Sequence, residues 1–191
     1  MLANQVRKAL IILAVCLTVV GCDEERKQGC VITKTSPSSF AYLSKGNKGR
    51  IELVAVDSTW EIRHYSDEKL LDVWTLLHPV YQFDCGDLTG DSVPEILVGV
   101  IKPTRYRKEP DKRLFIFHLY KGRKIRPLWL GSRLGLPLKD FKVERDSVPA
   151  MIHTWERDTD GTTVERVYRQ QGFGLKYVSE FHNRKKFNRS K

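Results

Sequence analysis

The 191-residue sequence has no segment that keeps apolar residues at a 3.6-residue period for three turns. This argues against a fold built from packed helices. Gly-x-Ser-x-Gly, a phosphate-binding loop and a dinucleotide fingerprint are also absent. The histidines show no zinc-ligand spacing to one another or to a cysteine; they are His64, His78, His118, His153 and His182. No catalytic residue is predicted.

Cysteine is scarce, and its four positions carry most of the information about cellular location. The basic residues Arg7 and Lys8 are followed by an apolar run over residues 9–20, which is too short to span a bilayer comfortably. The run ends in Val19, Val20, Gly21 and Cys22, followed by a polar stretch. This order of segments is typical of a cleaved signal peptide.

Val19-Val20-Gly21-Cys22 resembles the bacterial lipobox. The resemblance implies diacylglycerol transfer to the Cys22 thiol, cleavage before Cys22 and acylation of the new amino group, so that several acyl chains hold the protein on a membrane. The alternatives are an ordinary secretory signal or an uncleaved anchor helix. Asp23, directly after the cysteine, is compatible with retention at the periplasmic face of the inner membrane, and Asp23-Glu24-Glu25 with an outer-membrane or surface location.

An extracytoplasmic location leaves Cys30 and Cys85 as the remaining thiols of the mature chain, where an oxidising compartment allows them to pair. The alternative is a small buried Cys85 and a Cys30 in a loose tail. Loss of Arg7 and Lys8 with the signal lowers the formal net charge from +10 to +8. This charge favours anionic partners such as lipid headgroups or acidic envelope polymers; the alternative is a solvated surface with a basic tail, and nucleic acid is not expected outside the cytoplasm.

From residue 40 onward, short apolar and β-branched runs recur between turn signals, and we predict an all-β antiparallel meander of about 10–12 strands. The candidate strands are residues 51–56, 59–65, 70–76, 80–84, 95–102, 113–120, 125–130, 141–145, 150–156, 163–169 and 175–181. Residues 96–100 and 114–117 are apolar throughout, so both faces of these strands should be covered, as in stacked sheets. The four tryptophans, Trp60, Trp74, Trp129 and Trp155, are interpreted as core residues rather than carbohydrate platforms.

Internal repetition also indicates stacked units, the alternative being chance similarity among β-strands joined by turns. Asp91-Ser92-Val93-Pro94 recurs as Asp146-Ser147-Val148-Pro149, and Gly46-Asn47-Lys48-Gly49 is a weaker relative; each precedes a strand. We therefore expect about three propeller-like units, as an open or incomplete propeller or as a two-layer sandwich. The expected boundaries are a signal peptide at 1–21, a lipidated tether at 22–39, a β-rich domain at 40–182 and a basic tail at 183–191.

The acidic segment at residues 87–95, DLTGDSVPE, resembles the loop of FG-GAP or VCBS-type propeller repeats, in which alternating oxygens bind calcium. The resemblance implies one Ca²⁺ site formed by the side chains of Asp87, Thr89, Asp91 and Glu95 and the carbonyl of Val93. Thr89 and Glu95 depart from the family pattern. The alternative is a metal-free turn in which aspartates accept hydrogen bonds from backbone amides.

Together these features predict a lipid-anchored, extracytoplasmic cell-envelope protein that acts as a non-enzymatic binding or scaffolding module. The sequence shows no catalytic set, and the biochemical activity is not predicted. Two alternatives stay open. A hydrolase of envelope or extracellular polysaccharide would require two carboxylates in a cleft. An accessory subunit of a membrane complex would require an exposed apolar patch.

Overall fold

A computed structural model describes residues 29–103, 108–131 and 134–182, and within these ranges the chain is all strand and turn, without a helix. The strands are β1 (Val31–Ser36), β2 (Ser39–Ser44), β3 (Asn47–Val56), β4 (Thr59–Ser66), β5 (Lys69–Leu76), β6 (Val80–Gly86), β7 (Glu95–Lys102), β8 (Asp111–Tyr120), β9 (Lys124–Leu130), β10 (Leu138–Glu144), β11 (Met151–Arg157), β12 (Thr163–Gln171) and β13 (Gly174–His182).

The strands form three antiparallel meanders in which sequence neighbours pair. Sheet A contains β1 to β5, sheet B contains β6 to β9 and sheet C contains β10 to β13. None of the three sheets is closed into a barrel. The prediction of an all-β antiparallel meander is confirmed.

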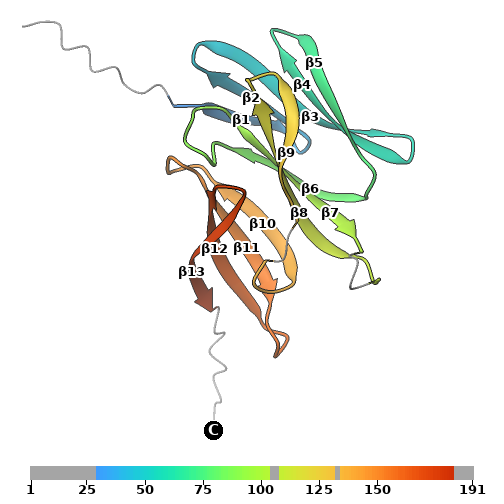
Figure 1. Cartoon of the computed structure of the whole chain (residues 1–191), viewed down its shortest axis with the longest axis vertical. Helices are drawn as coiled ribbons and strands as arrows, with labels where there is room; N and C mark the ends of the chain where they lie inside the picture. Colours follow the sequence, from blue (N-terminus) through green and yellow to red (C-terminus); the bar gives the residue numbers. More distant parts are fainter. Residues whose placement is uncertain (1–28, 104–107, 132–133, 183–191) are drawn as a thin grey trace, which may run out of the picture.

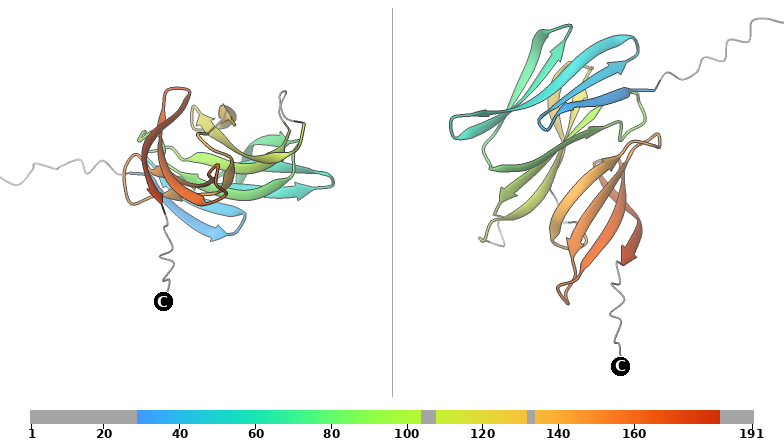
Figure 2. Two further views of the ribbon diagram at one scale, coloured as in Figure 1. Left: turned by 90° about the horizontal axis from the view of Figure 1, so that it is seen from below. Right: turned by 180° about the vertical axis from the view of Figure 1, so that it is seen from behind.

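Sheet B is the middle layer (Figure 1). One of its faces packs on sheet A through a core that includes Ile51, Ile62 and Phe117. Its other face packs on sheet C through Leu97, Ile116 and Phe141. Because consecutive side chains of a strand point to opposite faces, the continuous apolar run of β7 supplies both cores. Figure 2 shows the same three sheets from below and from behind.

The predicted strands correspond to β3 through β13, with β7 at the predicted bounds. Strand structure also extends upstream of residue 40, because β1 and the first residue of β2 lie within residues 22–39, which the sequence analysis assigned to the tether. Polar residues and Pro37 favoured a tether in the sequence, but pairing of β1 with β2, and of β2 with β3, holds this segment in sheet A.

Three turns of related sequence occupy the same place in successive units. The Gly46 turn joins β2 to β3, the acidic loop joins β6 to β7, and residues 145–150 join β10 to β11. Sheet A differs from the other two by the additional edge strand β1.

The signal peptide, the lipobox with Cys22 and the basic tail at 183–191 lie outside the described residues. Over the part of the chain that the structure describes, no helix is long and apolar enough to cross a membrane.

Candidate functional site

The acidic loop between β6 and β7 uses its carboxylates to hold its own backbone. The two Asp87 carboxylate oxygens accept hydrogen bonds from the amides of Gly90 (2.7 Å) and Ser92 (3.0 Å). The Asp91 side chain accepts one from the amide of Val93 (2.8 Å). Gly90 has a φ of +76°, a conformation that side chains other than glycine's rarely adopt. This arrangement is the amide-capped turn that the sequence left as the alternative to calcium.

Glu95 completes the loop from the first position of β7. Its side chain is buried and accepts hydrogen bonds from the amides of Leu88 (2.8 Å) and Thr89 (3.2 Å), while the Thr89 hydroxyl donates to its other oxygen (3.4 Å). Burial, together with the nearby carboxylates of Asp91 and Asp87, raises the pKa of Glu95 to about 8. Glu95 therefore serves the loop as a buried hydrogen-bond acceptor.

The five residues of the predicted calcium site thus lie in one loop, but both carboxylate oxygens of Asp87 and one each of Asp91 and Glu95 accept hydrogen bonds from backbone amides. In the described ranges, no three His, Cys, Asp or Glu side chains form a group that could hold a metal ion. Val93, predicted to offer its carbonyl oxygen, packs its side chain against the core between sheets A and B. Calcium binding by this loop stays a prediction.

The acidic loop also joins the three sheets. From sheet A, the Ser44 hydroxyl donates to the carbonyl of Ser92. From sheet C, the amide of Ala150 donates to the carbonyl of Asp87 (2.7 Å). The loop is therefore a structural junction, and its carboxylate–amide hydrogen bonds are accounted for by this role without a bound ligand.

Cys30 and Cys85 are both free thiols in this structure, Cys85 fully buried at the end of β6 and Cys30 just before β1. Burial, followed by the acidic loop's carboxylates, raises the pKa of Cys30 to about 12. Burial also raises the pKa of Cys85, and the Cys30 thiol contributes to that rise. The two thiols therefore lie in the same part of the molecule, and their pairing stays a prediction.

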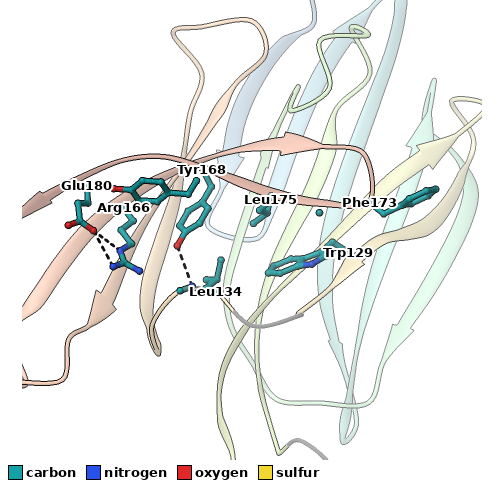
Figure 3. Close-up of a pocket in the computed structure, with 10 residues that line it drawn as sticks. Trp129, Leu134, Arg166, Tyr168, Phe173, Leu175 and Glu180 are labelled. Carbon is teal, nitrogen blue, oxygen red and sulfur yellow. Dashed lines mark hydrogen bonds and ion pairs between the residues drawn. The ribbon is translucent and has the colours of Figure 1, made fainter.

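A cleft of about 650 Å³ lies between sheets B and C, and we take it as the candidate site. Its sheet-B side is formed by Trp129 of β9 and by Leu134, which follows that strand. Its sheet-C side is formed by the β12–β13 hairpin, including Tyr168 and Leu175 (Figure 3). This volume is within the range of about 300–1,000 Å³ typical of ligand sites.

A buried polar network fixes the sheet-C wall of this cleft. The Glu156 carboxylate is fully buried and accepts hydrogen bonds from the hydroxyls of Tyr168 (2.8 Å) and Thr154 (2.8 Å) and from the amide of Leu136 (2.7 Å). Burial and the bond to Glu156 raise the pKa of Tyr168 to about 12, so its hydroxyl stays protonated and donates at neutral pH. The network ties the 134–136 segment to sheet C.

Arg166 of β12 links this buried network to the open cleft. One guanidinium nitrogen lies 3.4 Å from a Glu156 oxygen, and another lies 3.1 Å from a Glu180 oxygen on β13. Gly135 permits this placement, since a Cβ there would lie 2.1 Å from an Arg166 nitrogen. The Arg166–Glu180 pair forms one end of the cleft, as Figure 3 shows.

Aromatic side chains line the rest of the cleft. Phe173, in the turn between β12 and β13, is 92% exposed, and Tyr177 is 47% exposed. Tyr177 packs edge-on against Tyr168, with ring centroids 6.1 Å apart. Figure 3 shows Trp129 on the opposite side of the cleft from Leu175 and Phe173. The cleft therefore combines apolar rings from two sheets with one paired cation.

The sequence did not reveal this site. Trp129 was interpreted as core, and it is indeed largely buried, but it also lines the cleft. Leu134 and Gly135 follow Trp129 closely in the chain, but the other lining residues belong to the β12–β13 hairpin, which begins at Thr163, and only the fold brings the two groups together. The one local signal was Phe173, an aromatic residue between two turn glycines where a polar residue is usual.

Comparison of this chain with protein-family models, with curated proteins and with solved structures finds no match.

Proposed function

We propose that this protein is a lipid-anchored, extracytoplasmic cell-envelope protein that binds a ligand in the cleft between sheets B and C. The cleft carries the proposal: it has the size of a ligand site and holds the exposed aromatic side chains of Phe173 and Tyr177 beside the Arg166–Glu180 pair. The signal-peptide and lipobox pattern ending at Cys22 supports the location.

Binding is favoured over hydrolysis because the two carboxylates at the cleft are already engaged. Glu156 is fully buried, and its oxygens accept hydrogen bonds from Tyr168, Thr154 and Leu136. Glu180 is paired with Arg166. A glycoside hydrolase requires one accessible acid and one accessible base or nucleophile on either side of the substrate bond, and this arrangement offers no such pair.

A second candidate function, an accessory subunit of a membrane complex, is favoured by the edge of sheet C. β13 pairs with β12 alone in the sheet order, and its exposed side chains include Tyr177, Val178 and Phe181. An open strand edge with apolar side chains is a surface to which another chain can add a strand. A partner protein at this edge would cover part of the same cleft rim.

Two measurements test the proposal. Metabolic labelling with a fatty acid should mark the wild-type chain and leave Cys22→Ala unmarked; equal labelling of both would disprove the anchor. For the cleft, the purified full-length chain in detergent micelles is sedimented with isolated bacterial envelopes. Phe173→Ala combined with Tyr177→Ala should reduce the bound fraction.

The matched control for the cleft is Tyr120→Ala, because Tyr120 is 49% exposed and lies outside the cleft at the end of β8. Envelope binding that is equal in wild type, control and double variant would show that the cleft is not the binding site.

A further inference from the structure

We propose that the cleft between sheets B and C binds a neutral saccharide chain and disfavours acidic polymers, although the protein as a whole is basic. This inference rests on the proposal that the cleft is a ligand site. It concerns the chemistry of the ligand, which follows from the cleft's shape, its aromatic walls and its local charge.

The shape suits an elongated ligand with two kinds of surface. The Arg166–Glu180 pair forms one end, and Phe173 with Trp129 forms the other, as Figure 3 shows. Leu134 and Leu175 lie between them on opposite sides. A ligand lying along this cleft would meet apolar side chains on both of its faces and polar groups at one end.

Saccharide rings match this arrangement. A pyranose ring has axial C–H groups that form apolar faces, and it carries hydroxyls around its rim. Phe173 and Tyr177 expose aromatic surface that such faces can cover, and Trp129 lies across the cleft. Arg166 supplies hydrogen-bond donors and Glu180 supplies acceptors at a fixed 3.1 Å separation, which suits hydroxyls because each one both donates and accepts.

Local charge discriminates between neutral and acidic saccharides. Arg166 lies between two carboxylates, 3.4 Å from Glu156 and 3.1 Å from Glu180, so these three described side chains together carry one more negative charge than positive. An acidic sugar would bring a third carboxylate to one guanidinium, and like charges in a partly buried site repel. The cleft therefore opposes the long-range attraction of the net positive charge, which is +8 after loss of Arg7 and Lys8 from the +10 of the whole sequence.

The same pair argues against a fatty acyl chain as the ligand. An acyl chain would cover the aromatic walls, but its methylene groups offer no hydrogen bond to Arg166 or Glu180, and the carboxylate of a free fatty acid would be opposed by Glu156 and Glu180 as that of an acidic sugar is. Burying a charged pair without new hydrogen bonds is unfavourable. A neutral saccharide offers both apolar contact with the aromatic side chains and hydrogen bonds to the Arg166–Glu180 pair.

The experiment uses the full-length chain in detergent micelles, titrated with chitotetraose, cellotetraose and maltotetraose as neutral probes, tetragalacturonate as the acidic probe and laurate as the acyl probe. Heat and tryptophan fluorescence are recorded, and Trp129→Phe identifies the signal that comes from the cleft. We expect saturable binding of at least one neutral tetrasaccharide at millimolar concentration or below. Phe173→Ala combined with Tyr177→Ala should weaken it about tenfold or more, which corresponds to about 1.4 kcal/mol, and Tyr120→Ala should not.

Charge selection is tested with Glu180→Gln, which keeps the size of the side chain and removes one negative charge. We expect the affinity for tetragalacturonate to rise relative to that for the neutral probe. An unchanged ratio would overturn the charge argument.

Three results would overturn the proposal: no binding of any neutral probe, tighter binding of tetragalacturonate or laurate by the wild type, or neutral binding that the cleft variants leave unchanged. If envelope sedimentation still depends on Phe173 and Tyr177 while the neutral saccharides fail, the ligand class is wrong and the cleft remains a binding site. If both experiments fail, the proposed function is wrong as well.

Discussion

The two junctions of the middle sheet differ, although each joins one antiparallel meander to another. At the junction of sheets A and B, β9 packs against β4 and β5. The Asp72 carboxylate accepts a hydrogen bond from the amide of Ile125 (2.8 Å), and Trp74 packs on Phe117 with ring centroids 5.6 Å apart. His64 reaches across to the carbonyl of Arg123 (2.8 Å). This junction is closed along the last strands of both sheets.

The junction of sheets B and C is closed where β10 packs on β6 and β8. There the amide of Val143 donates to Asp84 (2.8 Å), Arg145 pairs with Asp84, and Gln82 donates to the carbonyl of Phe141. Gly86 allows close approach, since a Cβ at this position would lie 2.4 Å from a Val143 methyl. The last strands, β9 and β13, line the cleft instead.

Because strands pair in sequence order in all three sheets, the side chains on the inner faces decide which junction packs closed and which leaves a cleft. Sheet A sends Ile62, Trp74 and Leu76 toward sheet B, and these side chains join the shared core. The corresponding last strands of sheet C carry Arg166 and Glu180, which need polar partners and cannot be packed against Trp129 without loss of hydration. At the closed junction, His64 and Asp72 of sheet A find their hydrogen-bond partners in sheet B. Arg166 instead pairs with Glu156 and Glu180 of its own sheet, so these ion pairs lie within sheet C and do not join it to β9.

The largest change in the free energy of unfolding is expected from a substitution in the core between sheets A and B. Phe117→Ala removes a fully buried ring from the core between sheets A and B and should lower the free energy of unfolding by about 3–5 kcal/mol. Denaturant unfolding measures the loss. Phe173→Ala, at the open junction, is the control and should stay within about 0.5 kcal/mol of wild type. Equal losses for the two variants would contradict the comparison.

The next effect is expected from a disulfide that would link the start of sheet A to sheet B. If Cys30 and Cys85 are oxidised to a disulfide, the closed loop of roughly 55 residues should add on the order of 4 kcal/mol to the free energy of unfolding. Oxidation should be slow, because burial and acidic neighbours raise the pKa of Cys30 to about 12 and the thiolate is the reactive form. Mass spectrometry after controlled oxidation detects the bond.

Cys30→Ser is the control for oxidation. It should remove both the mass change of the disulfide and the added stability. A mass change in wild type without any gain in stability would show that the bond strains the native sheets.

A smaller effect is expected at the open junction. Glu156→Gln keeps one acceptor oxygen but replaces the other with a donor, so Leu136, Tyr168 and Thr154 lose part of their shared partner. We expect a loss of about 1–3 kcal/mol in denaturant unfolding. Glu180→Gln, on the solvent side of Arg166, should change stability by less than about 1 kcal/mol. A larger loss of stability in Glu180→Gln than in Glu156→Gln would show that Glu180, not Glu156, contributes more to stability at this junction.

Much of this comparison was accessible from the sequence, because alternating and continuous apolar runs located β3 through β13. The continuous run of β7 and the apolar centre of β8 also indicated a middle sheet covered on both faces. These patterns are local, and each reports directly on the burial of its own strand.

The rest required partners far away in the chain. β1 and β2 are polar enough to resemble a tether, and their place in sheet A depends on pairing with β3. The cleft brings Trp129 and Leu134 next to a hairpin that begins at Thr163, and no periodicity encodes that approach. The acidic loop was recognisable as a turn, but only its hydrogen bonds show that Asp87 and Glu95 cap amides.

A further prediction concerns the pH dependence of the closed junction. His64 is fully buried; its Nδ1 donates to the carbonyl of Arg123, so its Nε2 accepts from the hydroxyl of Tyr42 (2.7 Å). Burial lowers the pKa of His64 below its usual 6.5. Between that lowered pKa and 6.5 the unfolded chain binds more protons than the folded chain, so the free energy of unfolding falls as pH falls through this window.

Urea unfolding at pH 7.5 and at pH 5.5 measures this loss, and His64→Gln is the matched variant. Gln keeps a donor and an acceptor without a titratable ring, so its loss between the two pH values should be smaller than that of wild type. Equal losses in both proteins would assign the pH dependence to other groups.

The smallest effect is expected at the acidic loop, where all three sheets meet. Because Asp87 and Glu95 already accept hydrogen bonds from the amides of Gly90 and Leu88, the folded loop needs no cation to hold its shape. We therefore expect the melting temperature to change little between millimolar Ca²⁺ and chelator. A binder would gain stability by mass action, so a clear rise with Ca²⁺ that Asp87→Asn abolishes would establish the calcium site. Such a result would show that the junction of the three sheets binds a ligand, as the cleft between sheets B and C is proposed to do.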